Sequence, residues 1–273
     1  MPILLFSGLF LGIFIAWILL RHLRSARRRA IYAAPFAADW IHVLNKNVPL
    51  YRALPQELQV ELHQHTNVFL GQKRFEGCGG LIITDEIRVT IAAQACVLLL
   101  NRDTNYFPGF KTILVYPDTY VAAGVRKDGL VETLEDDVRL GESWHRGPVV
   151  LSWGDVMREA SQDRDGHNVV LHEFAHKLDE ENDISDGLPV LGNDSQYKTW
   201  AEVLTQEYSL LQERAQQGEN VVLDEYGATS PAEFFAVATE TFFEKPIELK
   251  ETHPLLYGEL RKFYKVDPFQ WYQ

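Results

Sequence analysis

The chain is poor in cysteine, with only Cys78 and Cys96 among its 273 residues. Two thiols cannot form the disulfide framework of a small secreted domain, and two reduced thiols are favoured over a single disulfide. Two cysteines also exclude a cysteine-rich zinc site. Any metal must therefore be bound by histidine and carboxylate side chains.

The sequence also lacks the excess of positive charge that is typical of nucleic-acid-binding proteins. Five of its 26 basic residues lie within residues 1–30, which contain no acid; this leaves 21 basic against 38 acidic residues, a formal charge of −17, in the rest. Because such a body repels phosphate groups, no direct binding to DNA or RNA is expected. The composition, with 46% hydrophobic residues, still provides a sizeable core.

The N-terminal 30 residues combine a long apolar run with a basic cluster. Residues 3–20 carry no charge, and as a helix they would span ~27 Å at ~1.5 Å per residue, close to the ~30 Å hydrocarbon core of a bilayer. The five arginines follow this run, whereas a signal peptide has its positive charge first. A buried core helix is the other alternative. The pattern predicts a transmembrane anchor with a basic juxtamembrane segment over residues 1–30, and a cytoplasmic body over residues 31–273.

Hydrophobic periodicity predicts helices and short strands in largely separate parts of the body. The predicted strands cover residues 112–117, 119–124, 129–134 and 148–153, and the predicted helices cover residues 55–73, 84–100, 154–162, 166–180, 195–217, 231–244 and 252–264. This segregation predicts an α+β fold with a small, mostly antiparallel sheet.

The segment that carries chemistry is an HExxH motif, in which His172, Glu173 and His176 are the fixed residues. On a helix, residues four apart lie one turn above each other, so both imidazoles can bind one Zn²⁺. Glu173 can then accept a proton from a metal-activated water and pass it to the leaving amine. The alternative is a core histidine pair with Glu173 at the surface.

A third protein ligand must come from elsewhere in the chain. The metzincin pattern fails, because Asp179 replaces its glycine and Asn182 replaces its third ligand. The predicted helix over residues 231–244 offers Glu233, which shares one side of the helix with Glu240. Two carboxylates on an apolar helix require a cation or hydrogen bonds. Glu233 is the candidate ligand, with an N-terminal helix acid as its alternative.

Three further residues are candidates for supporting roles. Glu240 is suited to orient a metal-bound histidine, and Asp179, one turn after His176, either holds an imidazole N–H or is a surface acid. Tyr226 lies in a turn-like stretch before Glu233, from which a phenol could donate to the oxyanion of a tetrahedral intermediate.

Three segments together resemble the Mlc titration factor A family of bacterial zinc peptidases. They are VVLHEFAHKLD (169–179), GPVVLSW (147–153) and EYGATSPAEFFAVATETFF (225–243), and FYKVDP (263–268) supports them. The resemblance covers about residues 50–270. It implies a zincin-like fold of gluzincin type, similar to the catalytic domain of anthrax lethal factor. The implied ligands are His172, His176 and Glu233, with Glu173 as general base and Tyr226 as transition-state donor.

Two departures from the family pattern bear on function. Members of the family can lack an N-terminal anchor, and some have a histidine near the metal where this chain has Glu132. The prediction is a single-pass protein of the bacterial inner membrane that hydrolyses a peptide or protein substrate, in the manner of an aminopeptidase. The alternative is a tethered binding module that sequesters a DNA-binding transcriptional repressor, the kind of partner for which the family is named.

Overall fold

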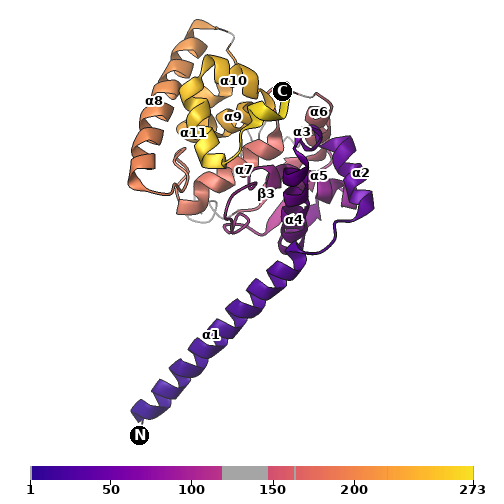
Figure 1. Ribbon diagram of the computed structural model, residues 1–273, viewed down its shortest axis with the longest axis vertical. Coiled ribbons are helices and arrows are strands. Elements are labelled where there is room, and N and C mark those ends of the chain that lie inside the picture. Colours follow the sequence, from indigo (N-terminus) through magenta and orange to yellow (C-terminus); the bar gives the residue numbers. More distant parts are fainter. Residues whose placement is uncertain (1, 119–146, 163, 220, 273) are drawn as a thin grey trace.

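The computed structural model describes residues 2–118, 147–162, 164–219 and 221–272, with side chains from residue 14 onward. A long helix, α1 (Pro2–Tyr32), projects from a body of packed helices and one small sheet (Figure 1). The body combines many helices with one small sheet, so the prediction of a mixed fold is confirmed, and both cysteines are free thiols.

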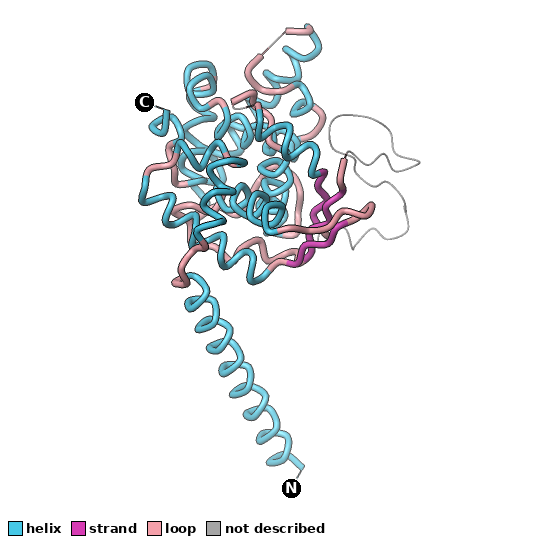
Figure 2. The backbone as a smooth tube through the Cα atoms, turned by 90° about the vertical axis from the view of Figure 1, so that its right-hand side faces the viewer, coloured by secondary structure: helices cyan, strands magenta, loops and turns pink. Residues whose placement is uncertain are grey.

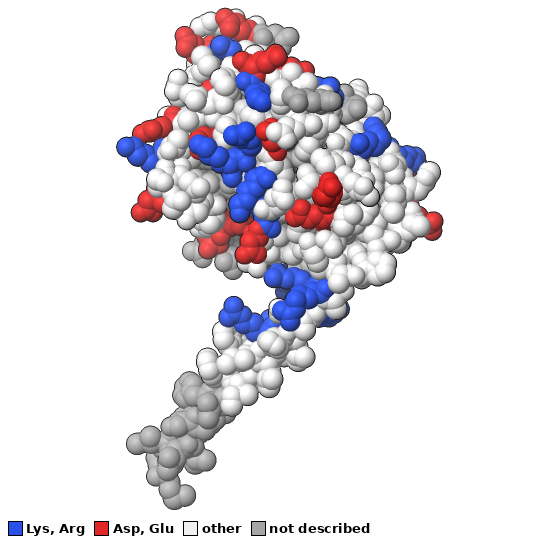
Figure 3. All heavy atoms as spheres, viewed as in Figure 1, with Lys and Arg blue, Asp and Glu red and all other residues white. Residues whose placement is uncertain are grey.

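The prediction of a membrane anchor is wrong. No helix among the described residues has the length and apolar character needed to cross a membrane. The five arginines of residues 1–30 lie on α1, in the same continuous helix as the apolar residues that precede them. Figure 3 shows this positive charge gathered where α1 meets the body. The single-pass topology and the inner-membrane localisation are withdrawn, and so is the cytoplasmic placement that rested on them.

The sheet contains three strands among the described residues: β1 (Arg74–Gly77), β2 (Thr112–Tyr116) and β3 (Val149–Ser152). Their order is β1-β2-β3 and both pairings are parallel, so the predicted antiparallel arrangement is wrong. Parallel neighbours require long crossover connections rather than hairpins, and a helix lies between β1 and β2. The strands lie side by side at one edge of the body (Figure 2). The predicted strands over 119–124 and 129–134, and Glu132, lie outside the described residues.

The predicted helices of the body are confirmed within a few residues at most ends. The helices after α1 are α2 (Ala38–Asn47), α3 (Pro49–Ala53), α4 (Gln56–Gln72), α5 (Asp85–Val97), α6 (Trp153–Ser161), α7 (Val169–Asp179), α8 (Asp194–Gln217), α9 (Pro231–Glu244), α10 (Pro246–Thr252) and α11 (Pro254–Tyr264). Short 3-10 turns follow α7 (Glu180–Asn182), precede α9 (Glu225–Ala228) and end the chain (Pro268–Tyr272).

Helix α7 lies at the centre of the body, between α5 and α9. Its Phe174 is fully buried against Phe69, Phe107 and Phe110, with ring centroids 5.6, 4.9 and 5.7 Å away. Burial of one such side chain contributes about 1.5–3 kcal/mol. This aromatic packing fixes one face of α7 and leaves the opposite face for His172 and His176.

Candidate metal centre

The start of helix α7 is held by side chains that satisfy its first backbone amides. The Asn168 side chain accepts a hydrogen bond from the Leu171 amide at 3.1 Å, as an N-cap residue does. The Val169 amide donates to Glu159 at 2.6 Å. Burial raises the pKa of Glu159 to about 7, although its bond from Val169 opposes that shift. These two hydrogen bonds fix the start of α7, one turn before His172.

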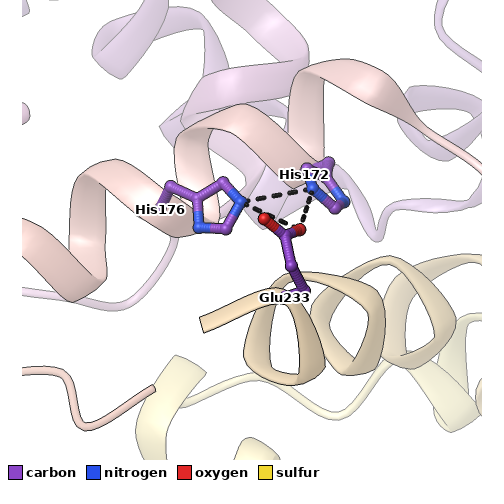
Figure 4. A group of neighbouring side chains, drawn as sticks. All are labelled: His172, His176 and Glu233. Atoms are coloured by element: carbon purple, nitrogen blue, oxygen red, sulfur yellow. Dashed lines mark hydrogen bonds and ion pairs between the residues drawn. The ribbon is translucent and has the colours of Figure 1, made fainter. Parts of the chain in front are cut away.

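The start of helix α9 is also capped, and this places Glu233 in its first turn. Ser230 accepts a hydrogen bond from the Glu233 amide at 3.2 Å, and Pro231 takes the first helical position. Helices α7 and α9 pack against each other, so the Glu233 carboxylate faces His172 and His176 (Figure 4).

Three donor atoms converge between the two helices. His172 Nε2 lies 3.0 Å from Glu233 Oε2, and His176 Nε2 lies 3.3 Å from the same oxygen. The two Nε2 atoms are 3.2 Å apart. Among the described residues, these three form the one group of histidine, cysteine and acidic side chains with the spacing of a metal site.

The three distances agree with a tetrahedral zinc site. Ligand atoms ~2.0–2.1 Å from a tetrahedral zinc ion lie about 3.3 Å from one another. The observed separations of 3.0, 3.2 and 3.3 Å are edges of that size. Three protein ligands also leave a fourth position for water or substrate, as in catalytic zinc sites. The residues therefore fit a zinc ion.

Glu240 supports His172 from the side opposite to the donor group. Its Oε1 lies 2.7 Å from His172 Nδ1, and its Oε2 accepts a hydrogen bond from the Asn168 amide at 2.6 Å. The Asn168 side chain in turn donates to Glu244 at 3.0 Å. If His172 Nδ1 carries its proton toward Glu240, the Nε2 lone pair is directed at the donor group, the arrangement that metal-bound histidines adopt.

The electrostatics of the metal-free group also favour a cation. Burial would lower the pKa of His172, but Glu240 and Glu233 together raise it well above its ordinary value. Burial would raise the pKa of Glu233, but hydrogen bonds from His172 and His176 lower it to about 2. In the absence of metal, the raised pKa of His172 favours a proton on that imidazole, and this positive charge balances the carboxylates around it.

The other predicted residues lie close to this group. Glu173 is partly buried, which raises its pKa, although His176 and His172 oppose the shift. Tyr226, in the 3-10 turn before α9, has its ring centroid 6.0 Å from that of His172. Asp179 fits neither predicted role. It is fully buried, and it accepts a hydrogen bond from the Gly187 amide at 2.8 Å.

Three supporting residues were not identified from sequence. Asn168, Glu159 and Glu244 hold the start of α7 or bind the residue that caps it. An asparagine directly before an apolar helix is an N-cap signal, and Glu244 lies one turn after Glu240 on the same helix. Glu159 had no comparable signal, because its contact joins two separate helices.

Comparisons with known proteins find one matching family and several similar proteins. The family described as glucose-regulated metallo-peptidase M90 matches residues 22–265. The chain is 41% identical over 249 residues to "Uncharacterized protein slr2042" of Synechocystis sp., covering 90% of each chain. It is 33% identical over 240 residues to the Mlc titration factor A proteins of Yersinia pestis and Yersinia pseudotuberculosis, covering 86% of this chain and 87% of theirs.

Proposed function

This chain belongs to the glucose-regulated metallo-peptidase M90 family, and on that premise we propose that it is a zinc-dependent peptidase. The observation that carries the proposal is the convergence of His172, His176 and Glu233 at tetrahedral spacing. The third ligand comes from a separate helix, far from the two histidines in sequence. Its position beside them supports a site that binds a metal ion.

Each residue of the site would have a distinct role. His172, His176 and Glu233 would hold the zinc ion, and Glu240 would keep the His172 ring in its ligating orientation. When bound, the zinc ion supplies a Lewis acid that lowers the pKa of water and polarises a peptide carbonyl. Glu173 would take the proton of the attacking water and deliver it to the leaving amine, a task that its raised pKa suits. Tyr226 would donate to the oxyanion.

The test of this function removes the general base and keeps the metal. Glu173→Gln preserves the size of the side chain but cannot accept a proton at neutral pH. We expect about one zinc per chain in both proteins, and hydrolysis lower by roughly 10²-fold or more in the variant. Metal content is measured by mass spectrometry, and cleavage with both free-amine and internally quenched peptides. Cleavage by the variant at the wild-type rate, with zinc bound, would refute the role of Glu173.

A second candidate function rests on the name of the Yersinia relatives, Mlc titration factor A. That name suggests that this chain also binds a transcriptional regulator such as Mlc, although no membrane tether is now part of the proposal. The test mixes purified Mlc with the full-length chain and follows complex formation by size-exclusion chromatography. If binding is the function, Glu173→Gln should form the complex as well as the wild type does. A wild-type chain that cleaves peptides and forms no complex would exclude this candidate.

A further inference from the structure

Helices α7 and α9 are joined at a second place, beyond the donor group. Asp179 is the last residue of α7 and is fully buried. Its Oδ2 accepts hydrogen bonds from the Gly187 amide at 2.8 Å and from the Ser185 hydroxyl at 3.5 Å. The chain that leaves the HExxH helix is therefore folded back onto the end of that helix.

Gly187 touches three helices at once. Its amide is bonded to Asp179 of α7, and its carbonyl accepts a hydrogen bond at 3.0 Å from the indole of Trp200 on α8. It has φ +75°, and a Cβ added there would lie 2.4 Å from the carbonyl oxygen of Pro231, in the first turn of α9. Only glycine fits both this backbone conformation and this close approach.

The contact with Pro231 bears directly on the metal centre. Pro231 precedes Glu233 by two residues, and both lie in the first turn of α9. Glu233 must remain within 3.0–3.3 Å of the two imidazoles, which lie on α7. Gly187 thus lies between the end of α7 and the first turn of α9, the two helices that carry the three donor residues.

The carboxylate of Asp179 is placed at a cost in stability. Burial raises its pKa to about 6, although the bond from Gly187 opposes that shift. Its second oxygen, Oδ1, is buried and has no hydrogen-bond partner among the described residues. A buried carboxylate with one unbonded oxygen is a poor means of stabilising a fold. What the Asp179 carboxylate does provide is a fixed acceptor for the Gly187 amide.

We propose that Asp179 and Gly187 are positioning residues, which set the separation of Glu233 from His172 and His176 through the Pro231 contact. The inference rests on the proposed zinc site. The competing explanation is that the contact only stabilises the fold, in which case its loss would lower stability without a specific effect on the donor group.

The experiment compares two deletions of a buried carboxylate in the full-length chain. Asp179→Ala removes the acceptor of the Gly187 amide. Glu207→Ala is the matched control, because Glu207 is also a buried carboxylate with a partner, His253 at 2.7 Å, but lies on α8 outside the α7–α9 junction. Zinc affinity is measured by competition with a chelator, and thermal unfolding is measured for the metal-free proteins. Two further variants, Asp179→Asn and Gly187→Ala, complete the set.

We expect Asp179→Ala to weaken zinc binding by roughly 10-fold or more, the usual effect of losing support behind a ligand. Gly187→Ala should do the same, because its Cβ forces Pro231 away. Asp179→Asn retains an oxygen acceptor and should recover most of the affinity. Glu207→Ala should lower the unfolding temperature and leave zinc affinity unchanged. Equal losses of affinity in Asp179→Ala and Glu207→Ala, or no loss in Asp179→Ala and Gly187→Ala, would overturn the proposal.

A second readout separates this inference from the proposed function. In the metal-free protein, the imidazole NMR signals of His172 and His176 report their contacts with Glu233. These signals should shift in Gly187→Ala and stay in place in Glu207→Ala. A wild-type chain that binds no zinc refutes the proposed function, and the NMR comparison still decides the positioning role. Unshifted signals in Gly187→Ala would refute it.

Discussion

Two buried histidine–carboxylate clusters in this chain have similar components and different chemistry. In one, His65 uses both ring nitrogens, Nδ1 with the Tyr106 hydroxyl at 2.9 Å and Nε2 with Glu61 at 3.2 Å. In the other, His172 and His176 point their Nε2 atoms at each other, 3.2 Å apart. Both ring nitrogens of His65 have partners within the protein, whereas two imidazole nitrogens and a carboxylate oxygen face one another in the His172 cluster at the spacing of a metal site. Burial and a carboxylate partner alone therefore do not identify a metal site.

The strongest test of this comparison is the loss of one histidine from each cluster. His176→Ala removes one of three protein ligands, and we expect the bound zinc to fall from about one per chain to under ~0.1 after dialysis against a weak chelator. His65→Ala should retain zinc and lose stability, since it leaves Glu61 and Tyr106 without their shared partner. Mass spectrometry gives the metal content and urea unfolding gives the stability. If His65→Ala lost its zinc and His176→Ala kept it, the metal site would have to be assigned to the His65 cluster.

A second, smaller contrast concerns the tyrosine beside each histidine. Tyr226 lies next to His172 and is proposed to donate to the oxyanion, so Tyr226→Phe should lower kcat and kcat/KM together, by about 10²-fold, with zinc retained. Tyr106→Phe removes the hydroxyl bonded to His65 and should leave kcat unchanged. Steady-state kinetics of both variants on one peptide substrate tests this contrast. A change of KM alone in Tyr226→Phe would make that residue a substrate-binding group instead.

The local parts of the centre could be predicted from sequence. The HExxH spacing on an apolar helix indicates His172, Glu173 and His176, and the Ser-Pro start of α9 places Glu233 at a helix N-terminus. The buried role of Asp179 could not be predicted, because it depends on where Gly187 meets Pro231. That contact joins segments 44 residues apart, and no spacing rule brings them together.

Three errors of the sequence prediction concern the direction of the strands, the strand β1 and the membrane anchor. Alternating apolar residues indicate a strand but not the direction of its neighbour; that direction follows from the long connections, one of which contains α5. The strand β1 has no run of β-branched residues to mark it. The anchor prediction took residues 3–20 as a membrane span and the arginines as its flank, whereas no helix among the described residues is long and apolar enough to cross a membrane.

The smallest expected effect is a difference in acid sensitivity between the two clusters in the metal-free protein. Glu233 has a pKa of about 2 in the folded chain, against an ordinary value of 4.5, because hydrogen bonds from His172 and His176 outweigh the effect of burial. A lowered pKa means that the carboxylate contributes stability that is fully present above pH ~4.5 and is lost as the pH falls toward 2. The pKa of Glu61 is lowered as well, through its bonds with His65 and the Asn101 amide, against the effect of burial.

Urea unfolding at pH 6 and pH 3.5 measures this difference against the matched variants Glu233→Gln and Glu61→Gln. The stability gap between wild type and Glu233→Gln should shrink by roughly 1–2 kcal/mol from pH 6 to pH 3.5, because the wild type alone loses the ionised carboxylate's contribution. The gap for Glu61→Gln should shrink less, since only the Glu233 shift is large. Saturating zinc should widen the gap for Glu233→Gln at pH 6, because zinc stabilises only a chain that retains its ligands. A gap for Glu233→Gln that is constant with pH would mean that hydrogen bonds from His172 and His176 do not lower the pKa of Glu233, and the contrast between the two clusters would then rest on geometry alone.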